Sequence, residues 1–147
     1  MRAVGGILAG LIAGLIATIL VGIFGVGATI SGPISVDASN PRQVVEAFAN
    51  MGTGPNIALM LAWLIGGLVG ALIAKLITRR SWAAWTVAIL IALYVVLNML
   101  VLPLPGWMQA LSVIAPLIGG LIGNHLVGTG AATEAEIAEA EDAPADL

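Results

Sequence analysis

The chain has 147 residues, of which 60% are hydrophobic and only 9% are charged. A soluble domain carries roughly 25% charged residues, so we expect lipid to be the solvent for most of this chain. The formal net charge is −3, histidine occurs once and cysteine is absent. The sequence therefore provides no basic face for nucleic acid, no disulfide framework and no cluster of metal or cofactor ligands.

Four apolar stretches are long enough to cross the hydrocarbon core of a bilayer as α-helices. The first follows Arg2 and is much longer than the apolar core of a signal peptide, so it is expected to remain as a span. Pro103–Gly106 predicts a turn between the third and fourth. Tryptophans fall where spans are expected to meet the interface, at positions Trp82, Trp85 and Trp107. The predicted spans cover about residues 3–27, 55–76, 82–102 and 107–127.

A polar segment, residues 31–54, separates the first two spans. Within it, Asn40 can cap a helix, Pro41 suits the first helical position and Gln43 can reach back to the cap. The apolar residues that then share one helical face are Val44, Phe48 and Met51. We therefore expect a short amphipathic helix on the outer surface of the membrane.

The basic residues are divided unequally between the two ends of the predicted spans. One end has Arg42 alone, and the other has Arg2, Lys75, Arg79 and Arg80. The positive-inside rule places the end with four bases in the cytoplasm. Both chain termini are then expected to be cytoplasmic.

Six of the eight acidic residues follow residue 133. We therefore divide the chain into a transmembrane domain, residues 1–129, and an acidic cytoplasmic tail, residues 130–147. Thr133–Glu136 matches the pattern that begins a helix, whereas a block of like charges is more typical of a solvated segment. Both interpretations remain open for the tail.

Small residues recur at every fourth position in three of the spans, which predicts close helix packing because lipid provides no hydrophobic drive between helices. The stripes are Gly6, Gly10, Gly14, Thr18 and Gly22 in the first span, Ala58, Ala62, Gly66, Gly70 and Ala74 in the second, and Ala115, Gly119 and Gly123 in the fourth. A stripe can face another span or another protein. For Gly10 and Gly14 we expect the second span of the same chain.

Two heptapeptides nearly repeat, namely Leu64–Gly70 (LIGGLVG) and Leu117–Gly123 (LIGGLIG). The same offset aligns Asn56 with Gln109. This pattern predicts two duplicated helix hairpins, unless the abundance of Gly, Leu and Ile produces the match by chance.

Uncharged polar residues occur in the outer third of the spans, at Asn56, Asn98, Gln109 and Ser112. They could line a cavity for a lipid headgroup or polar solute. We favour hydrogen bonding between helices, with Asn98 bonded to the fourth span near Gln109 or Ser112. His125 is expected to be an interfacial side chain rather than a pH sensor, because it lacks the partners that a site needs.

The sequence resembles a family of small, uncharacterised bacterial membrane proteins with four helices. The resemblance covers most of residues 1–127 and is carried by the glycine-rich first span and by Asp37–Pro41, Leu61–Gly67, Arg80–Trp85, Asn98 and Leu102–Met108. It implies a four-helix inner-membrane architecture and no activity.

Together these features predict an all-α, integral membrane bundle of four transmembrane helices in a bacterial inner membrane. No Asp, Glu or Arg lies within a span, and Lys75 is near a span end, which argues against proton-coupled transport and acid–base catalysis. The expected function is non-enzymatic: a packing or accessory subunit that contacts membrane lipids and associates with itself or with a larger membrane complex. The alternative is a small carrier or channel for a lipid or uncharged polar solute.

Overall fold

The computed structural model describes residues 2–29, 39–50, 52–100 and 106–141. This part of the chain forms five helices and contains no strand: α1 (Arg2–Thr29), α2 (Pro41–Ala49), α3 (Thr53–Thr78), α4 (Ser81–Met99) and α5 (Gly106–Glu141). All except α2 are long and apolar enough to cross a membrane. The prediction of an all-α multi-pass membrane protein with four spans is therefore confirmed.

The observed spans agree with the predicted ones within a few residues at most ends. α3 begins at Thr53, so Pro55 lies in the first helical turn, where its missing N–H is tolerated. α4 ends at Met99, before the predicted end at residue 102, and residues 101–105 lie outside the described chain.

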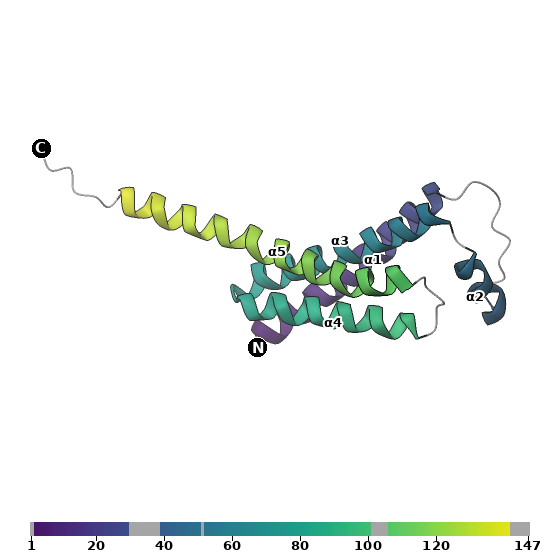
Figure 1. Cartoon of the computed structure of the whole chain (residues 1–147). Coiled ribbons are helices and arrows are strands. Elements are labelled where there is room, and N and C mark those ends of the chain that lie inside the picture. Colours follow the sequence, from purple (N-terminus) through teal and green to yellow (C-terminus); the bar gives the residue numbers. More distant parts are fainter. Residues whose placement is uncertain (1, 30–38, 51, 101–105, 142–147) are drawn as a thin grey trace, which may run out of the picture.

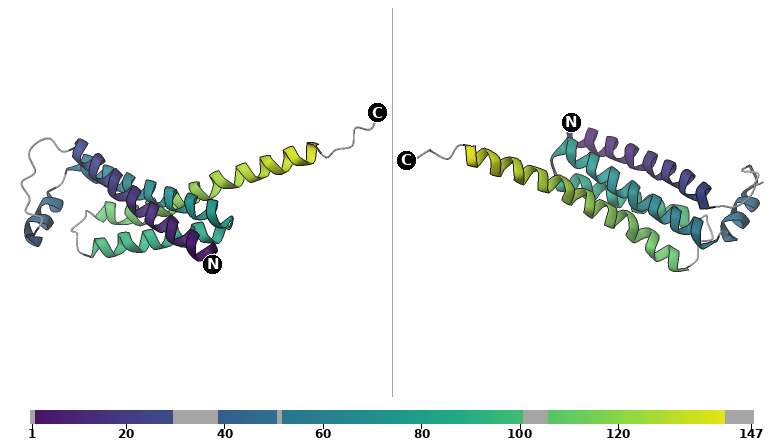
Figure 2. Two further views of the ribbon diagram at one scale, coloured as in Figure 1. Left: turned by 180° about the vertical axis from the view of Figure 1, so that it is seen from behind. Right: turned by 90° about the horizontal axis from the view of Figure 1, so that it is seen from above.

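The four spans lie alongside one another, with α3 in the centre. α3 contacts α1, α4 and α5, and α4 also contacts both α1 and α5. Figure 2 shows α1 and α5 on opposite sides of α3, and Figure 1 shows α4 along the lower side of this layer. The helix that joins most of the bundle together is therefore α3.

The two ends of the bundle carry different elements. At one end, which we call the basic end, Arg79 and Arg80 connect α3 to α4. Arg79 adopts the left-handed conformation (φ 54°), and its N–H donates to the Lys75 carbonyl over 2.7 Å, which completes the last turn of α3. α1 begins at this end, and α5 passes out of the bundle there (Figure 1). The opposite end, near α2, is called the α2 end.

α2 begins as the sequence predicts. Pro41 is its first residue, and the Arg42 N–H donates to the Asn40 Oδ1 over 3.1 Å. The helix is drawn apart from the four spans, beyond the ends of α1 and α3 (Figure 1). The side chains of Val44, Phe48 and Met51, on which the predicted apolar face depends, lie outside the described part.

The bundle interior is built mainly from small side chains. The fully buried alanines come from α3 and α4, and they are Ala62, Ala71, Ala74, Ala83, Ala84 and Ala88. The larger aliphatic side chains of α1, such as Ile12 and Ile16, are instead exposed on the outside of the bundle. Lipid is as apolar as these side chains, so the interior gains from close backbone approach rather than from hydrophobic burial.

The stripe of α1 faces the stripe of α3 within the same chain. A Cβ atom placed on Gly10 would lie 2.6 Å from the Gly70 carbonyl oxygen, and one placed on Gly14 would lie 2.8 Å from the Gly66 oxygen. Real Cβ atoms do not approach other atoms so closely. Thr18, the next member of the stripe, is buried and donates from its hydroxyl to the Gly14 carbonyl over 2.9 Å.

The contact between α1 and α3 continues toward both ends of the bundle. A Cβ on Gly6 would overlap the Thr78 side chain at the basic end. Gly22 is looser, because its nearest neighbour would be the Ala62 Cβ at 3.8 Å. A Cβ on Gly25 would lie 3.2 Å from the Ala58 Cβ. The stripe of small residues in α1 is therefore occupied by α3 over most of its length.

A second seam joins α3 to α5, which run in the same direction. A Cβ on Gly119 would overlap the Leu64 carbonyl oxygen, one on Gly67 would overlap the Pro116 carbonyl oxygen, and one on Gly123 would lie 2.6 Å from the Leu68 oxygen. Each of these obstacles is backbone. The main chains of α3 and α5 therefore meet directly, and no side chain fits between them.

The repeated heptapeptides have different neighbours. Gly66 packs on α1 and Gly70 lies between α1 and α4, whereas the matching residues Gly119 and Gly123 pack on α3. Duplicated hairpins related by a two-fold axis would give matching glycines matching partners. The contacts of these four glycines do not follow that symmetry.

α5 continues without interruption from Gly106 to Glu141. The segment from residue 128 to Glu141 extends about 20 Å beyond Val127, at 1.5 Å per residue. It projects past the other helices (Figure 1). The helix-start pattern at Thr133 thus lies inside a continuing helix and does not begin a separate one.

Candidate functional site

The four polar residues that the sequence places in the outer third of the spans differ in their exposure. Asn56 and Ser112 are buried, Asn98 is half-buried and Gln109 is exposed. They belong to α3, α4 and α5, near the α2 end. Their different exposure means that they do not share one environment.

Two of these residues, Asn98 and Ser112, make hydrogen bonds within their own helices. The Asn98 Nδ2 donates to the Tyr94 carbonyl over 2.8 Å, and the Ser112 hydroxyl donates to the Met108 carbonyl. The bond described for Asn98 is therefore made inside α4, not to α5 as the sequence predicts. A carbonyl one turn earlier is always within reach of a short polar side chain, whereas a partner on another helix depends on how the helices are rotated.

An apolar cluster occupies part of the interior at this end. Trp63, Val95 and Met108, from α3, α4 and α5, are buried together, with Leu59 and Met99 packed against them. Large apolar side chains thus occupy the place where the three helices meet. This arrangement gives little support to the solute cavity that was considered for the polar residues.

The basic end holds a polar contact that crosses the α3–α5 seam. The Lys75 ammonium, which is half-buried, donates to the Asn124 carbonyl of α5. The Asn124 Oδ1 is also buried, and it has no hydrogen-bond partner among the residues that the structure describes. The sequence placed Lys75 near the end of its span, and sequence reasoning missed this contact. No local pattern signals it, because the acceptor is a backbone atom 49 residues away.

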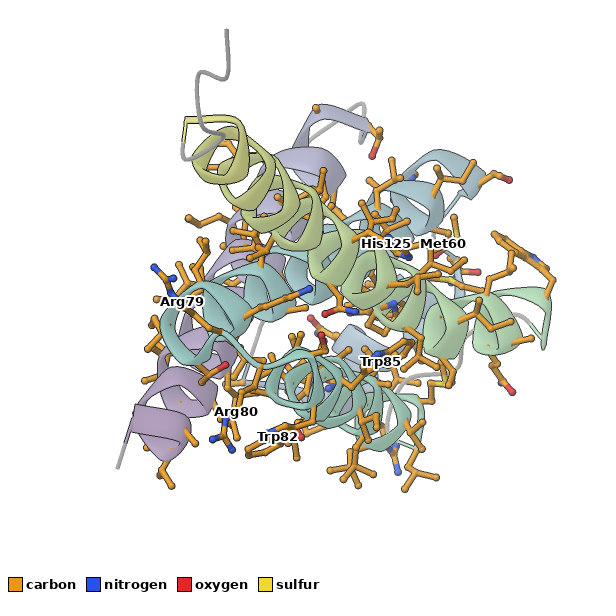
Figure 3. All side chains as sticks on the ribbon, turned by 90° about the vertical axis from the view of Figure 1, so that its left-hand side faces the viewer. Met60, Arg79, Arg80, Trp82, Trp85 and His125 are labelled. Atoms are coloured by element: carbon orange, nitrogen blue, oxygen red, sulfur yellow. The ribbon has the colours of Figure 1, made fainter. Side chains whose placement is uncertain are left out.

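Charged and aromatic side chains surround the basic end. Figure 3 views the bundle from this end, with Arg79 and Arg80 on the outside and Trp82 close to Arg80. Both arginines and Trp82 are exposed, and Trp85 lies one turn further along α4. His125 is exposed on α5. Its exposure matches an interfacial position better than a site with fixed partners.

Within the described part of the chain, no three His, Cys, Asp or Glu side chains come together as metal ligands would. The features that stand out are thus the two seams of glycine packing, the basic end and the projecting part of α5. Comparison with protein-family models, with curated protein sequences and with solved structures finds no match for this chain.

Proposed function

We propose that this chain is a non-enzymatic accessory subunit of a bacterial inner membrane, which contacts a larger membrane complex through the projecting part of α5. The single observation that carries the proposal is the continuation of α5, as one helix, about 20 Å beyond Val127. A second candidate, the solute carrier or channel, has no observation of this kind in its favour.

The small-residue stripes contribute less to this proposal than the sequence suggests. They pack against other helices of the same chain, at the α1–α3 and α3–α5 contacts. They are therefore not available as the contact with another protein. The outward faces of the spans carry large aliphatic side chains, such as Ile16 and Leu93, that are suited to lipid. The contact with a partner is therefore assigned to the part of α5 that leaves the bundle.

The chemistry of this segment defines the kind of partner. Its sequence is rich in alanine and glutamate, both strong helix formers, and it contains Glu134, Glu136, Glu139 and Glu141. Acidic segments of this kind often serve as interaction tails. We therefore propose a basic surface as the binding partner, located on the side of the membrane to which α5 projects.

We assign that side to the cytoplasm, because four of the five basic residues are at the basic end or at the start of α1. Cysteines introduced for Ala49, the last residue of α2, and for Ser81, at the basic end, test this assignment. Both residues are exposed, and the chain has no cysteine of its own. In intact cells, a membrane-impermeant thiol reagent should label Ala49→Cys only, and Ser81→Cys should react after permeabilisation. Labelling of both in intact cells would contradict the four-span topology.

The accessory role predicts that a partner co-purifies at fixed stoichiometry from the native membrane in a mild detergent. Replacement of Glu134, Glu136, Glu139 and Glu141 by Gln should reduce the partner to background, because the segment loses its charge but keeps good helix formers. Quantitative mass spectrometry of the purified complex measures this. The thermal stability of the four spans should not change, since the segment lies beyond them.

Arg42→Gln is the control for a change of charge elsewhere, because Arg42 is exposed on α2, at the opposite end. This variant should keep the partner. If the wild-type chain retains no partner at fixed stoichiometry, or if the Gln variant retains it fully, the proposed function is wrong. Uptake of a solute into vesicles containing the pure protein would instead favour a carrier or channel.

A further inference from the structure

Three cationic side chains gather where α3 ends. The half-buried Lys75 is held by its bond to the Asn124 carbonyl, and Arg79 and Arg80 follow it as exposed residues of the turn into α4. The positive φ and the capping bond of Arg79 hold this turn in one conformation. The positive charges are thus presented by a structured part of the chain rather than by a free tail.

Among the residues whose side chains the structure describes, no acidic group lies beside these cations. Glu46, the acidic residue whose side chain is described, belongs to α2 at the opposite end of the bundle, and the glutamates of α5 begin at Glu134, beyond the end of the span at Val127. The Asn124 carbonyl is a neutral acceptor, and an ammonium group has three donors. The described side chains of the basic end therefore carry positive charge that an external anion can neutralise.

The depth of this charge in the membrane follows from the aromatic residues beside it. Trp82 and Trp85, in the first turns of α4, are 49% and 38% exposed at the side of the bundle. Tryptophans that face lipid concentrate at the level of the headgroups. Arg80 precedes Trp82 by two residues, and Lys75 lies one turn before the end of α3. These cations are therefore at the depth of lipid phosphate.

We propose that the basic end, defined by Lys75, Arg79 and Arg80, binds the phosphate of an anionic phospholipid. Lys75 supplies a charge at the end of the α3–α5 seam, and the two arginines supply guanidinium groups that suit phosphate oxygens. The tryptophans flank the glycerol and upper acyl region of the same lipid. Clusters of bases at the end of membrane helices are a known means of recognising anionic lipids. This inference does not depend on the accessory-subunit proposal.

The test uses the full-length protein in detergent, to which phosphatidylglycerol or phosphatidylcholine is added. Native mass spectrometry should show retained phosphatidylglycerol, with an affinity at least about tenfold above that for phosphatidylcholine. Each base removed should weaken phosphatidylglycerol binding about fivefold, so Arg79→Asn with Arg80→Gln should weaken it about twenty-five-fold. Asparagine is chosen at Arg79 because it tolerates the left-handed conformation. Equal retention of the two lipids, or unchanged binding in this double variant, would overturn the proposal.

Further variants separate binding at this site from general effects. Arg42→Gln removes one base at the α2 end and should leave phosphatidylglycerol binding unchanged, and an equal loss in this variant would show attraction to net charge alone. Arg80→Lys keeps the charge and the fold, and it should retain most of the binding even if the double variant unfolds. Loss of all binding in Arg80→Lys would argue against the proposed site.

The same experiment distinguishes the lipid from two other anions that could occupy the site. Inorganic phosphate, added at the same concentration as the lipid, should not displace phosphatidylglycerol, because the acyl chains of the lipid add to its binding. Complete displacement would indicate a site for free phosphate and overturn the proposal. The acidic segment of a second copy is the remaining candidate. Dimers that dissociate in the double variant and carry no lipid would identify that segment as the occupant and overturn the proposal.

Discussion

Gly119→Ala is expected to destabilise the bundle by about 3 kcal/mol, at the upper end of the usual cost of overpacking. The added Cβ would overlap the Leu64 carbonyl oxygen and would lie 2.8 Å from the Leu68 nitrogen. Both atoms belong to the backbone of α3, so no side-chain rotation can relieve the overlap. α3 and α5 must separate, which removes the close contact that holds them together in lipid. Thermal unfolding of the purified protein in a mild detergent measures the loss.

Gly5→Ala is the matched control, because it makes the same change in a helix where a Cβ would meet nothing within 4 Å. Alanine is the better helix former, so this variant should keep its stability or gain up to about 1 kcal/mol. Gly67→Ala acts on the same seam, where its Cβ would overlap the Pro116 carbonyl oxygen. The double variant Gly67→Ala with Gly119→Ala should lose less than the two single losses combined, because one separation of α3 from α5 relieves both overlaps. Equal stability of Gly119→Ala and Gly5→Ala would refute the close approach of α3 and α5.

Gly14→Leu is the second substitution with a large expected effect, because Gly14 lies where α1, α3 and α4 meet. A Cβ at this position would lie 2.7 Å from the Ile91 Cδ1 and 2.8 Å from the Gly66 oxygen. A leucine side chain adds three more carbon atoms, so we expect a loss of more than about 3 kcal/mol. Leucine favours insertion into lipid, so α1 should still cross the membrane while its packing on α3 fails.

The measurement for Gly14→Leu must distinguish packing within the chain from packing against another protein. The pure monomer should unfold at a lower temperature than the wild type, in detergent and in the absence of any partner. Gly5→Leu places the same side chain on the same helix, at an exposed position where a Cβ would meet nothing within 4 Å, and should have little effect. A Gly14→Leu monomer that unfolds normally but loses a co-purifying protein would instead make the α1 stripe an intermolecular interface.

Several features of the fold could be predicted because they depend on local chemistry. A bilayer requires each span to satisfy its own backbone hydrogen bonds over about 30 Å, so the apolar stretches alone predict four helices and their approximate ends. The start of α2 follows from the Asn40 cap and the fixed φ of Pro41. The end of α5 was not predicted, since the charge pattern after Thr133 does not reveal whether the preceding helix continues.

The candidate sites were less predictable, because they depend on which surfaces meet. For Asn98, the sequence shows a polar side chain at a given depth but not the rotation of α4. A carbonyl of its own helix, that of Tyr94, is the acceptor described. The bond from Lys75 to the Asn124 carbonyl is of the same kind, because it requires α3 and α5 to lie side by side in a particular register.

The glycine stripes show most clearly where prediction from the sequence ends. The spacing of Gly10, Gly14, Gly66 and Gly119 by itself determined that helices would approach closely, since a bare backbone at every fourth position leaves room for a neighbour and lipid provides no hydrophobic drive between helices. Only the tertiary structure decided which neighbour each stripe meets: α3 for the stripe of α1, and α3 again for that of α5. The near-identical motifs of α3 and α5 thus acquire different partners. The physical reason is that a glycine permits contact without specifying the surface that makes it, so the choice depends on the packing of all four helices together.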